Sequence, residues 1–252
     1  MNSEIVSPDE VKTRIKTYWN ERSETFDQDV GHGADETESA LWKKYLSSII
    51  GTHPQKILDV GTGTGMIALN MAEIGHTVTG IDLGEKMLAI AKKKAETRNL
   101  DVCFTSGDAE NPQFPDNSFD CVICRHLLWT LPHPDKAIRE WARITRPGGV
   151  VIAIDGHAQP INYFPQPDEN QPVTSDREKL WHQMYCQEVV NSLPYRENLT
   201  IDAIKQLFTS QNLIDVRSEY ILEISEYQKK LMEGSTSNDH AEVQIIYGRV
   251  KE

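Results

Sequence analysis

The chain has 252 residues, of which 38% are hydrophobic and 25% charged, a composition typical of a globular protein. Its net charge of −12 argues against a nucleic-acid partner, since nucleic-acid binding relies on clustered Lys and Arg. No apolar run approaches the roughly 18 residues of a membrane span, and the polar, acidic N-terminus does not resemble a secretory signal. We therefore expect a cytoplasmic protein with no membrane contact.

The N-terminal residues predict a helical cap, over 1–50. Ser7 is a good N-cap and Pro8 fits the first turn, so a helix should begin there and run to about residue 20. A second helix is indicated over about 37–50, where apolar residues recur at helical spacing.

A glycine-rich stretch, Gly61-Thr62-Gly63-Thr64-Gly65, follows a short apolar run and precedes an apolar, helix-like segment. Strand, glycine loop and helix form the opening unit of a nucleotide-binding α/β fold. Asp82 ends the next strand, 21 positions after the first glycine, where such folds place an acid against a ribose hydroxyl. Met66 occupies the place of the third glycine of the dinucleotide pattern, which argues against a pyrophosphate ligand.

Strands and helices then alternate, which predicts a doubly wound, mostly parallel sheet within a core domain over 51–157. The expected strands are 57–61, 77–82, 101–105, 119–124 and 149–155, and the expected helices are 65–74, 85–97 and 134–145.

The alternation is interrupted over 158–200, a segment rich in proline and aromatic residues with one helix expected over 175–192. So long an interruption inside a compact domain is usually a lid or a substrate element. Residues 201–252 should complete the sheet, with a helix over 201–211 capped by Thr200. Two further strands, over 213–224 and 242–250, bring the total to seven, and the last should be antiparallel because no helical crossover is expected between them.

Cys121 and Cys124 have C-x-x-C spacing but lie on an expected strand, where positions three apart point to opposite faces. We interpret them as buried structural thiols. The histidines show no ligand spacing such as H-E-x-x-H, so no metal site is predicted.

The motifs over about 55–155 resemble those of class I S-adenosylmethionine-dependent methyltransferases, in the same order and at similar spacing. They are Gly61 to Gly65, Asp82-Leu83, Gly107-Asp108-Ala109-Glu110, Phe114-Pro115-Asp116-Asn117-Ser118-Phe119-Asp120 and Arg146-Pro147-Gly148-Gly149. The resemblance implies a Rossmann-like methyltransferase fold and S-adenosyl-L-methionine as cofactor, with S-adenosyl-L-homocysteine as product.

The resemblance also implies the residues that bind the cofactor. In this family the glycine loop lies against the methionine part, the acid after the second strand accepts the ribose hydroxyls, and the segment after the third strand reads adenine. The corresponding positions are Tyr18, Asp59, Gly61, Thr62, Gly63, Gly65, Asp82, Leu83, Met87, Asp108 and Ala109, where Asp59 would either orient the glycine loop or contact the amino group of the cofactor. Arg125, after the fourth strand, is a further candidate: it could bind the cofactor carboxylate or an acidic substrate, or only form a salt bridge.

The segment after the fourth strand should face the transferred methyl group, since ligands bind beyond the carboxyl ends of parallel strands. His126 is the candidate general base, although it could equally offer only its backbone carbonyl. The Asn/Asp-Pro-Pro-Tyr/Phe motif of many amine, DNA and protein methyltransferases is absent there. Candidate acceptor-lining residues are Trp19, His32, Trp129, His157, Tyr163 and Trp181.

The sequence thus predicts methyl transfer to N, O or S of a small molecule by a monomer or homodimer. Alternatives are an RNA or protein acceptor, a protein that holds the cofactor without turnover, and an NAD(P)-linked oxidoreductase.

Overall fold

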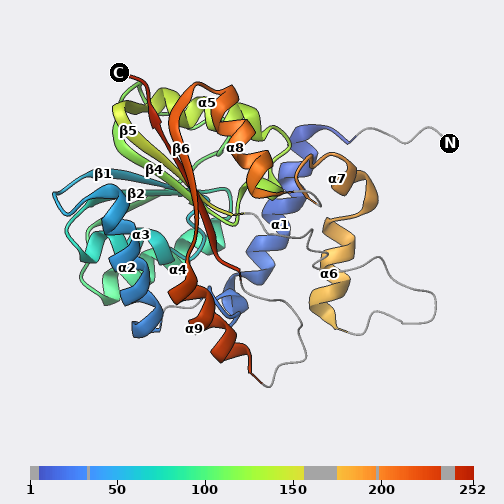
Figure 1. Ribbon diagram of the computed structural model, residues 1–252. Helices are drawn as coiled ribbons and strands as arrows, with labels where there is room; N and C mark the ends of the chain where they lie inside the picture. Colours follow the sequence, from blue (N-terminus) through green and yellow to red (C-terminus); the bar gives the residue numbers. More distant parts are fainter. Residues whose placement is uncertain (1–5, 33–34, 156–174, 197–198, 234–241) are drawn as a thin grey trace.

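The computed structural model describes residues 6–32, 35–155, 175–196, 199–233 and 242–252. Within them, seven strands form one sheet in the order β3-β2-β1-β4-β5-β7-β6 (Figure 1). The first five strands are parallel, and β7 runs antiparallel to both β5 and β6. The predicted methyltransferase fold with its antiparallel last strand is therefore confirmed. The strands are β1 (Lys56–Val60), β2 (Thr77–Asp82), β3 (Val102–Ser106), β4 (Phe119–Arg125), β5 (Thr145–Ile154), β6 (Leu213–Tyr220) and β7 (Gln244–Val250).

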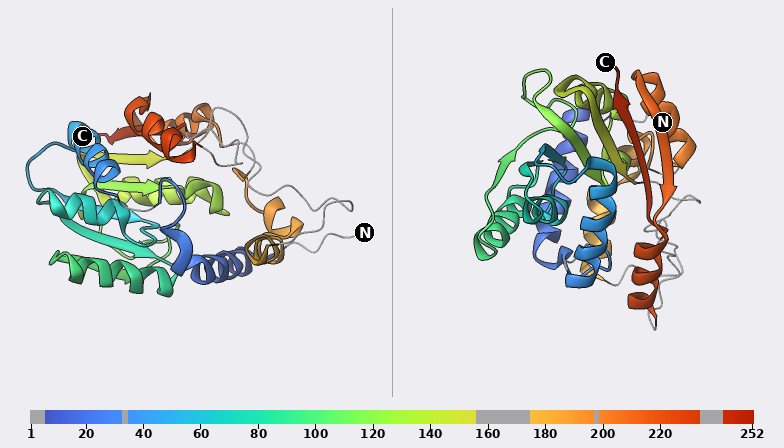
Figure 2. Two further views of the ribbon diagram at one scale, coloured as in Figure 1. Left: turned by 90° about the horizontal axis from the view of Figure 1, so that it is seen from below. Right: turned by 60° about the vertical axis from the view of Figure 1, so that its left-hand side comes forward.

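Helices cover both faces of the sheet, because each face carries its own cluster of buried apolar side chains. Trp42 belongs to the cluster on one face and Trp141 to the cluster on the other. In Figure 2, α1 and α6 lie next to each other at one end of the molecule. The helices are α1 (Pro8–Phe26), α2 (Glu36–Ile50), α3 (Met66–Glu73), α4 (Glu85–Thr97), α5 (Pro134–Ile144), α6 (Asp176–Met184), α7 (Gln187–Asn191), α8 (Ile201–Ser210) and α9 (Leu222–Met232), with a 3₁₀ turn at Leu128–Thr130.

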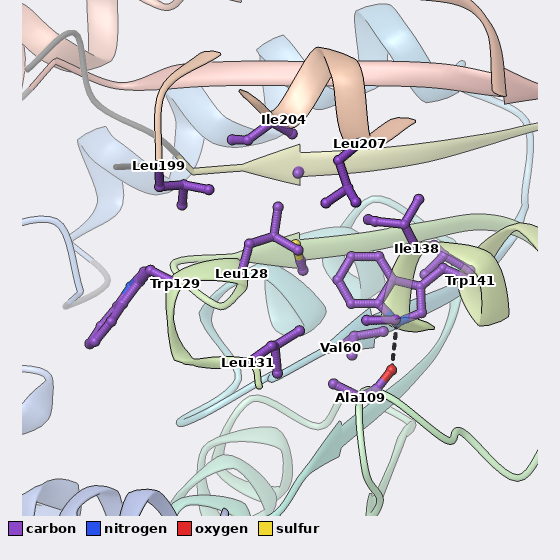
Figure 3. Close-up of a cluster of buried hydrophobic side chains, with 14 of the residues drawn as sticks. Val60, Ala109, Leu128, Trp129, Leu131, Ile138, Trp141, Leu199, Ile204 and Leu207 are labelled. Carbon is purple, nitrogen blue, oxygen red and sulfur yellow. Dashed lines mark hydrogen bonds between the residues drawn. The ribbon is translucent and has the colours of Figure 1, made fainter. Parts of the chain in front are cut away.

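The cluster around Trp141 holds two loops in place at the carboxyl edge of the sheet. The indole of Trp141 donates a hydrogen bond from Nε1 to the carbonyl oxygen of Ala109, at 2.8 Å (Figure 3). Leu128 and Leu131, from the segment after β4, are buried in the same cluster. The loops after β3 and β4 are therefore anchored in the core, which fixes the polar residues that they carry.

The two strand cysteines lie in different clusters, Cys121 with the residues around Trp42 and Cys124 with those around Trp141. Both are buried and free, as predicted from the alternation of side chains along a strand.

Several predicted boundaries are wrong. Helix α1 continues to Phe26 rather than ending near residue 20, because no glycine or proline interrupts 21–26 and Arg22 and Ser23 are buried on its inner side. Strand β5 begins at Thr145 instead of residue 149.

The other corrections lie in the second half of the chain. The helix expected over 175–192 is divided into α6 and α7, and β6 ends at Tyr220 because α9 begins at Leu222. A helix therefore connects β6 to β7, although the predicted antiparallel pairing of the two is correct. No helix in the described ranges is long and apolar enough to cross a membrane.

Candidate functional site

A cavity of about 180 Å³ lies at the carboxyl edge of the parallel strands, beneath α1 and α6. Its lining comes from the ends of β1 and β2 and from the segments that follow β1, β3 and β4, where an open α/β sheet places its ligand. His157 and Tyr163 lie outside the described residues. The cavity brings together the following predicted residues: Tyr18, Trp19, His32, Asp59, Gly61, Thr62, Gly63, Asp82, Leu83, Met87, Asp108, Ala109, Arg125, His126, Trp129 and Trp181.

Gly65 is the one described residue of the predicted set that is not part of the cavity lining. It begins α3 with a φ of +88°, and a Cβ there would lie 3.0 Å from Cβ of Ala91 and 3.1 Å from Cζ of Phe104. Close packing of α3 against α4 and β3 therefore explains this glycine. Gly61 does line the cavity, and packing also requires a glycine there, because its φ is +67° and a Cβ would lie 2.8 Å from Cδ1 of Leu127.

Asp59 fixes the glycine loop against the start of α3. Its Oδ2 accepts hydrogen bonds from Oγ1 of Thr62 at 2.6 Å and from the backbone N–H of Ala68 at 3.1 Å. Burial raises the pKa of Asp59 to about 7, although these hydrogen bonds oppose the rise. The contact with a cofactor amino group stays a prediction.

Asp82 lies at the end of β2 with its two oxygens pointing in different directions. Oδ2 accepts from the backbone N–H of Gly63 at 2.9 Å, and Oδ1 accepts from that of Gly84 at 2.7 Å. Burial raises its pKa, against the lowering effect of the backbone hydrogen bonds. Each carboxylate oxygen has a further lone pair, so the side chain can still accept one hydrogen bond on each oxygen.

Asp108 follows β3 and is tied to α1 by Lys12, a cavity residue that the sequence analysis missed. Nζ of Lys12 lies 2.8 Å from Oδ2 of Asp108 and 2.6 Å from Oε2 of Glu110. The other oxygen of Asp108 accepts the backbone N–H of Glu110. Lys12 and Asp108 are 96 positions apart, so no local sequence signal marks this contact.

Aromatic rings form a packed group in the lining of the cavity. Trp19 packs edge-on against Phe26 and Trp129, with ring centroids 5.6 and 6.2 Å apart. Trp181, from α6, packs against Tyr18 at 5.1 Å. Three segments, α1, the turn after β4 and α6, thus contribute one continuous group of rings.

Arg125, His32 and His126 lie together near these rings. Arg125 donates a hydrogen bond to the carbonyl oxygen of Gly31 and so contacts the turn after α1. Its predicted contact with the cofactor carboxylate stays a prediction. His126 has a φ of +52°, and its backbone N–H donates to the carbonyl oxygen of Ile154. The rings of His32 and His126 are 5.3 Å apart.

Within the described part of the chain, no group of three or more His, Cys, Asp or Glu side chains could hold a metal ion. Asp29 and Arg177 also line the cavity and were missed, since nothing in their local sequence marks them.

Comparison with known proteins agrees with this geometry. The model of a family described as "Methyltransferase domain" matches residues 58–153, which hold the glycine loop, Asp82 and Asp108. Residues 58–153 therefore form a domain of the class I S-adenosylmethionine-dependent methyltransferase family. The chain spans about half the length of the curated relatives that it matches.

The proteins that this chain resembles are named for different methylation reactions. A ubiquinone/menaquinone biosynthesis C-methyltransferase of Bdellovibrio bacteriovorus is 38% identical over 118 residues, which is 46% of this chain and 50% of that protein. A ubiquinone biosynthesis O-methyltransferase of Albidiferax ferrireducens is 40% identical over 114 residues, 44% of each chain. Among solved structures, a phosphoethanolamine N-methyltransferase of Haemonchus contortus in complex with S-adenosylhomocysteine has a TM-score of 0.66 at 19% identity. That likeness covers 99% of this chain and 61% of the other, and supports the fold.

Proposed function

We propose that this protein transfers a methyl group from S-adenosyl-L-methionine to a small-molecule acceptor. The observation that carries the proposal is Asp82, whose two oxygens are aimed by two backbone N–H groups and face a cavity along the carboxyl edge of the sheet. A carboxylate with one open acceptor position on each oxygen suits two vicinal hydroxyl groups. Such a pair occurs on a ribose.

The neighbouring residues fit the rest of the cofactor. Asp108 and Ala109 would read the adenine edge, since a carboxylate accepts from an amino group and a backbone N–H donates to a ring nitrogen. The glycine loop and Asp59 would hold the methionine part, because Asp59, Gly61, Thr62 and Gly63 line the cavity after β1. When bound, the cofactor supplies a methyl group already activated on a sulfonium.

The protein's own contribution is position and enclosure. Holding two reactants in line can lower a barrier by roughly 7–11 kcal/mol, so a strong general base is not required for rate. The rings of Trp19, Trp129 and Trp181 pack together in the cavity lining and would exclude water from a bound sulfonium.

A small acceptor is supported by the cavity volume of about 180 Å³ with aromatic residues in its lining, and by the net charge of −12, which disfavours RNA. The names of the relatives include both C- and O-methylation, so carbon joins the attacking atoms considered from the sequence.

Calorimetric titration with S-adenosylhomocysteine tests the proposal, with NADH titrated in parallel. We expect micromolar or tighter binding of S-adenosylhomocysteine and none of NADH. Asp82→Ala should weaken binding at least about a hundredfold, because two hydrogen bonds to a charged group are lost at about 1.5–3 kcal/mol each. Asp101→Ala removes an exposed carboxylate just before β3 and serves as the matched control. Binding of NADH alone would reject the proposal.

A further inference from the structure

The turn after α1 delivers His32 to the cavity in a fixed position. The backbone N–H of His32 donates to the carbonyl oxygen of Asp29 at 3.1 Å, and that of Asp29 donates to Phe26 at 3.2 Å. Gly31 has a φ of +79°, and its carbonyl oxygen accepts a hydrogen bond from Arg125. The ring of His32 packs edge-on against Phe26, with centroids 4.5 Å apart. Two consecutive turns and a contact from β4 therefore hold the imidazole.

The hydrogen bond at one ring nitrogen of His32 decides whether the other ring nitrogen carries a hydrogen or a lone pair. Nδ1 of His32 lies 3.2 Å from the carbonyl oxygen of Val30. A carbonyl oxygen only accepts, so Nδ1 carries the hydrogen and Nε2 has a lone pair. No described residue donates a hydrogen bond to Nε2, and His32 lines the cavity. The cavity wall therefore contains an acceptor of hydrogen bonds at this point.

The surroundings keep this imidazole neutral. Burial, and next the positive charge of Arg125, lower the pKa of His32 to about 3. The other charged or titratable groups around it are Asp29 in the same turn, Arg22 on α1, His126 after β4 and Arg177 on α6, and Arg22 and Arg177 both pair with Asp29.

We propose that Nε2 of His32 accepts a hydrogen bond from a hydroxyl group on an aromatic methyl acceptor and takes its proton as the methyl group is transferred. This inference rests on the proposed function. Aromaticity of the acceptor follows from the neighbouring rings of Phe26, Trp19 and Trp129, which offer faces and edges to a planar group.

The step balances without a further reactant. The acceptor oxygen uses a lone pair to form the new O–C bond, while the electrons of the broken C–S bond stay on sulfur and neutralise the sulfonium. The hydroxyl proton moves to Nε2 of His32 and then to water. A weakly basic imidazole cannot ionise a hydroxyl beforehand, but the oxygen becomes a strong acid once it bonds to the methyl group.

Nitrogen-15 NMR of the histidine rings tests this directly in protein loaded with S-adenosylhomocysteine, with phenol as the probe. His32→Phe identifies the resonances, because the ring and its packing on Phe26 are retained while both nitrogens are lost. We expect Nδ1 to be protonated and Nε2 unprotonated from pH 5 to 9. Phenol should shift the Nε2 resonance saturably, whereas anisole, which has the same ring without the hydroxyl hydrogen, should not.

The dissociation constant of phenol should rise about fivefold to tenfold in His32→Phe, and that of anisole should not change. His53→Gln alters an exposed histidine and is the control. Protonation of Nε2 in the free protein, absence of a shift with phenol, or a shift at His126 in place of His32 would each overturn the inference. Failure of S-adenosylhomocysteine to bind is seen before phenol is added and would instead reject the proposed function on which the inference rests.

Discussion

Lys12 connects α1 to the loop after β3, and its removal gives the most specific test of this packing. Nζ lies 2.6 Å from Oε2 of Glu110, whose side chain is 1% exposed, while that of Lys12 is 16% exposed. The other oxygen of Glu110 already accepts the backbone N–H of His133. Lys12→Met keeps most of the apolar stem and removes the charge, so Glu110 is left as a buried carboxylate without its cation.

The loss of stability expected for Lys12→Met lies between the values for a fully buried and a fully exposed ion pair. Breaking a fully buried ion pair costs about 3–5 kcal/mol, and an exposed pair contributes about 0–1 kcal/mol. With one partner buried and the other slightly exposed, we expect Lys12→Met to lower the free energy of unfolding by about 2–3 kcal/mol. Glu110→Gln in the same chain should restore at least half of the loss, since the uncompensated charge is then removed.

Urea denaturation of the wild type, both single variants and the double variant gives the coupling between the two residues. Burial lowers the pKa of Lys12, but the hydrogen bonds to Asp108 and Glu110 outweigh it and the net pKa is raised. The contribution is therefore present below the ordinary value of 10.5 and is lost only as pH rises through the raised pKa, so the coupling should be constant from pH 6 to 9. A coupling below about 0.5 kcal/mol would refute this reasoning.

Three further predictions concern the core. Burial raises the pKa of Asp59 to about 7 from 3.8, so its contribution to stability is present below about pH 4 and is lost as pH rises through 7. The free energy of unfolding of Asp59→Asn should therefore rise by roughly 2–4 kcal/mol relative to that of the wild type between pH 4 and 8. A difference between the two proteins that stays constant with pH would contradict this. Gly65→Ala should lower the free energy of unfolding by about 1–3 kcal/mol, because its φ is +88° and the new Cβ meets Ala91, and an unchanged melting temperature would be the contrary result. In native protein a thiol reagent should label the exposed Cys103 quickly and the buried Cys121 only after unfolding, and rapid labelling of Cys121 would mean that the sheet opens readily.

The central α/β unit could be predicted from the sequence because its signals are local. Strand, glycine loop and acid are each decided by a few neighbouring residues, and Gly61 and Asp82 lie where these signals place them. The seven-stranded, mostly parallel sheet and its antiparallel last strand were also predicted, and the structure agrees; the order of the strands comes from the structure alone.

Contacts between distant segments were beyond the sequence. The salt bridge of Lys12 to Asp108 joins residues 96 positions apart, and no periodicity reports it. The end of α1 was misplaced because its last turns are polar, although Arg22 is buried there by its pair with Asp29. The start of α9 was missed because the apolar residues around Ile221 fit a strand as well as a helix.

The sequence favours His126 as the base and the structure favours His32, and this difference also arises from contacts between distant segments. His126 is the candidate base from the sequence because it follows β4, which can be inferred from its position in the chain. The tautomer of His32 depends on the carbonyl oxygen of Val30, and the turn that carries His32 is held by Arg125, which is 94 positions from Gly31. Such chemistry becomes visible only in three dimensions.

The most direct measurement of methyl transfer is a label experiment with S-adenosylmethionine that carries a radioactive methyl group. The protein is incubated with a low-molecular-weight cell extract, and in parallel with phenol and catechol, and products are separated by size. We expect label in the small-molecule fraction, and loss of that label in Asp82→Ala but not in Asp101→Ala. Label found only in RNA or protein, or label that stays on the cofactor although S-adenosylhomocysteine binds, would contradict methyl transfer to a small molecule.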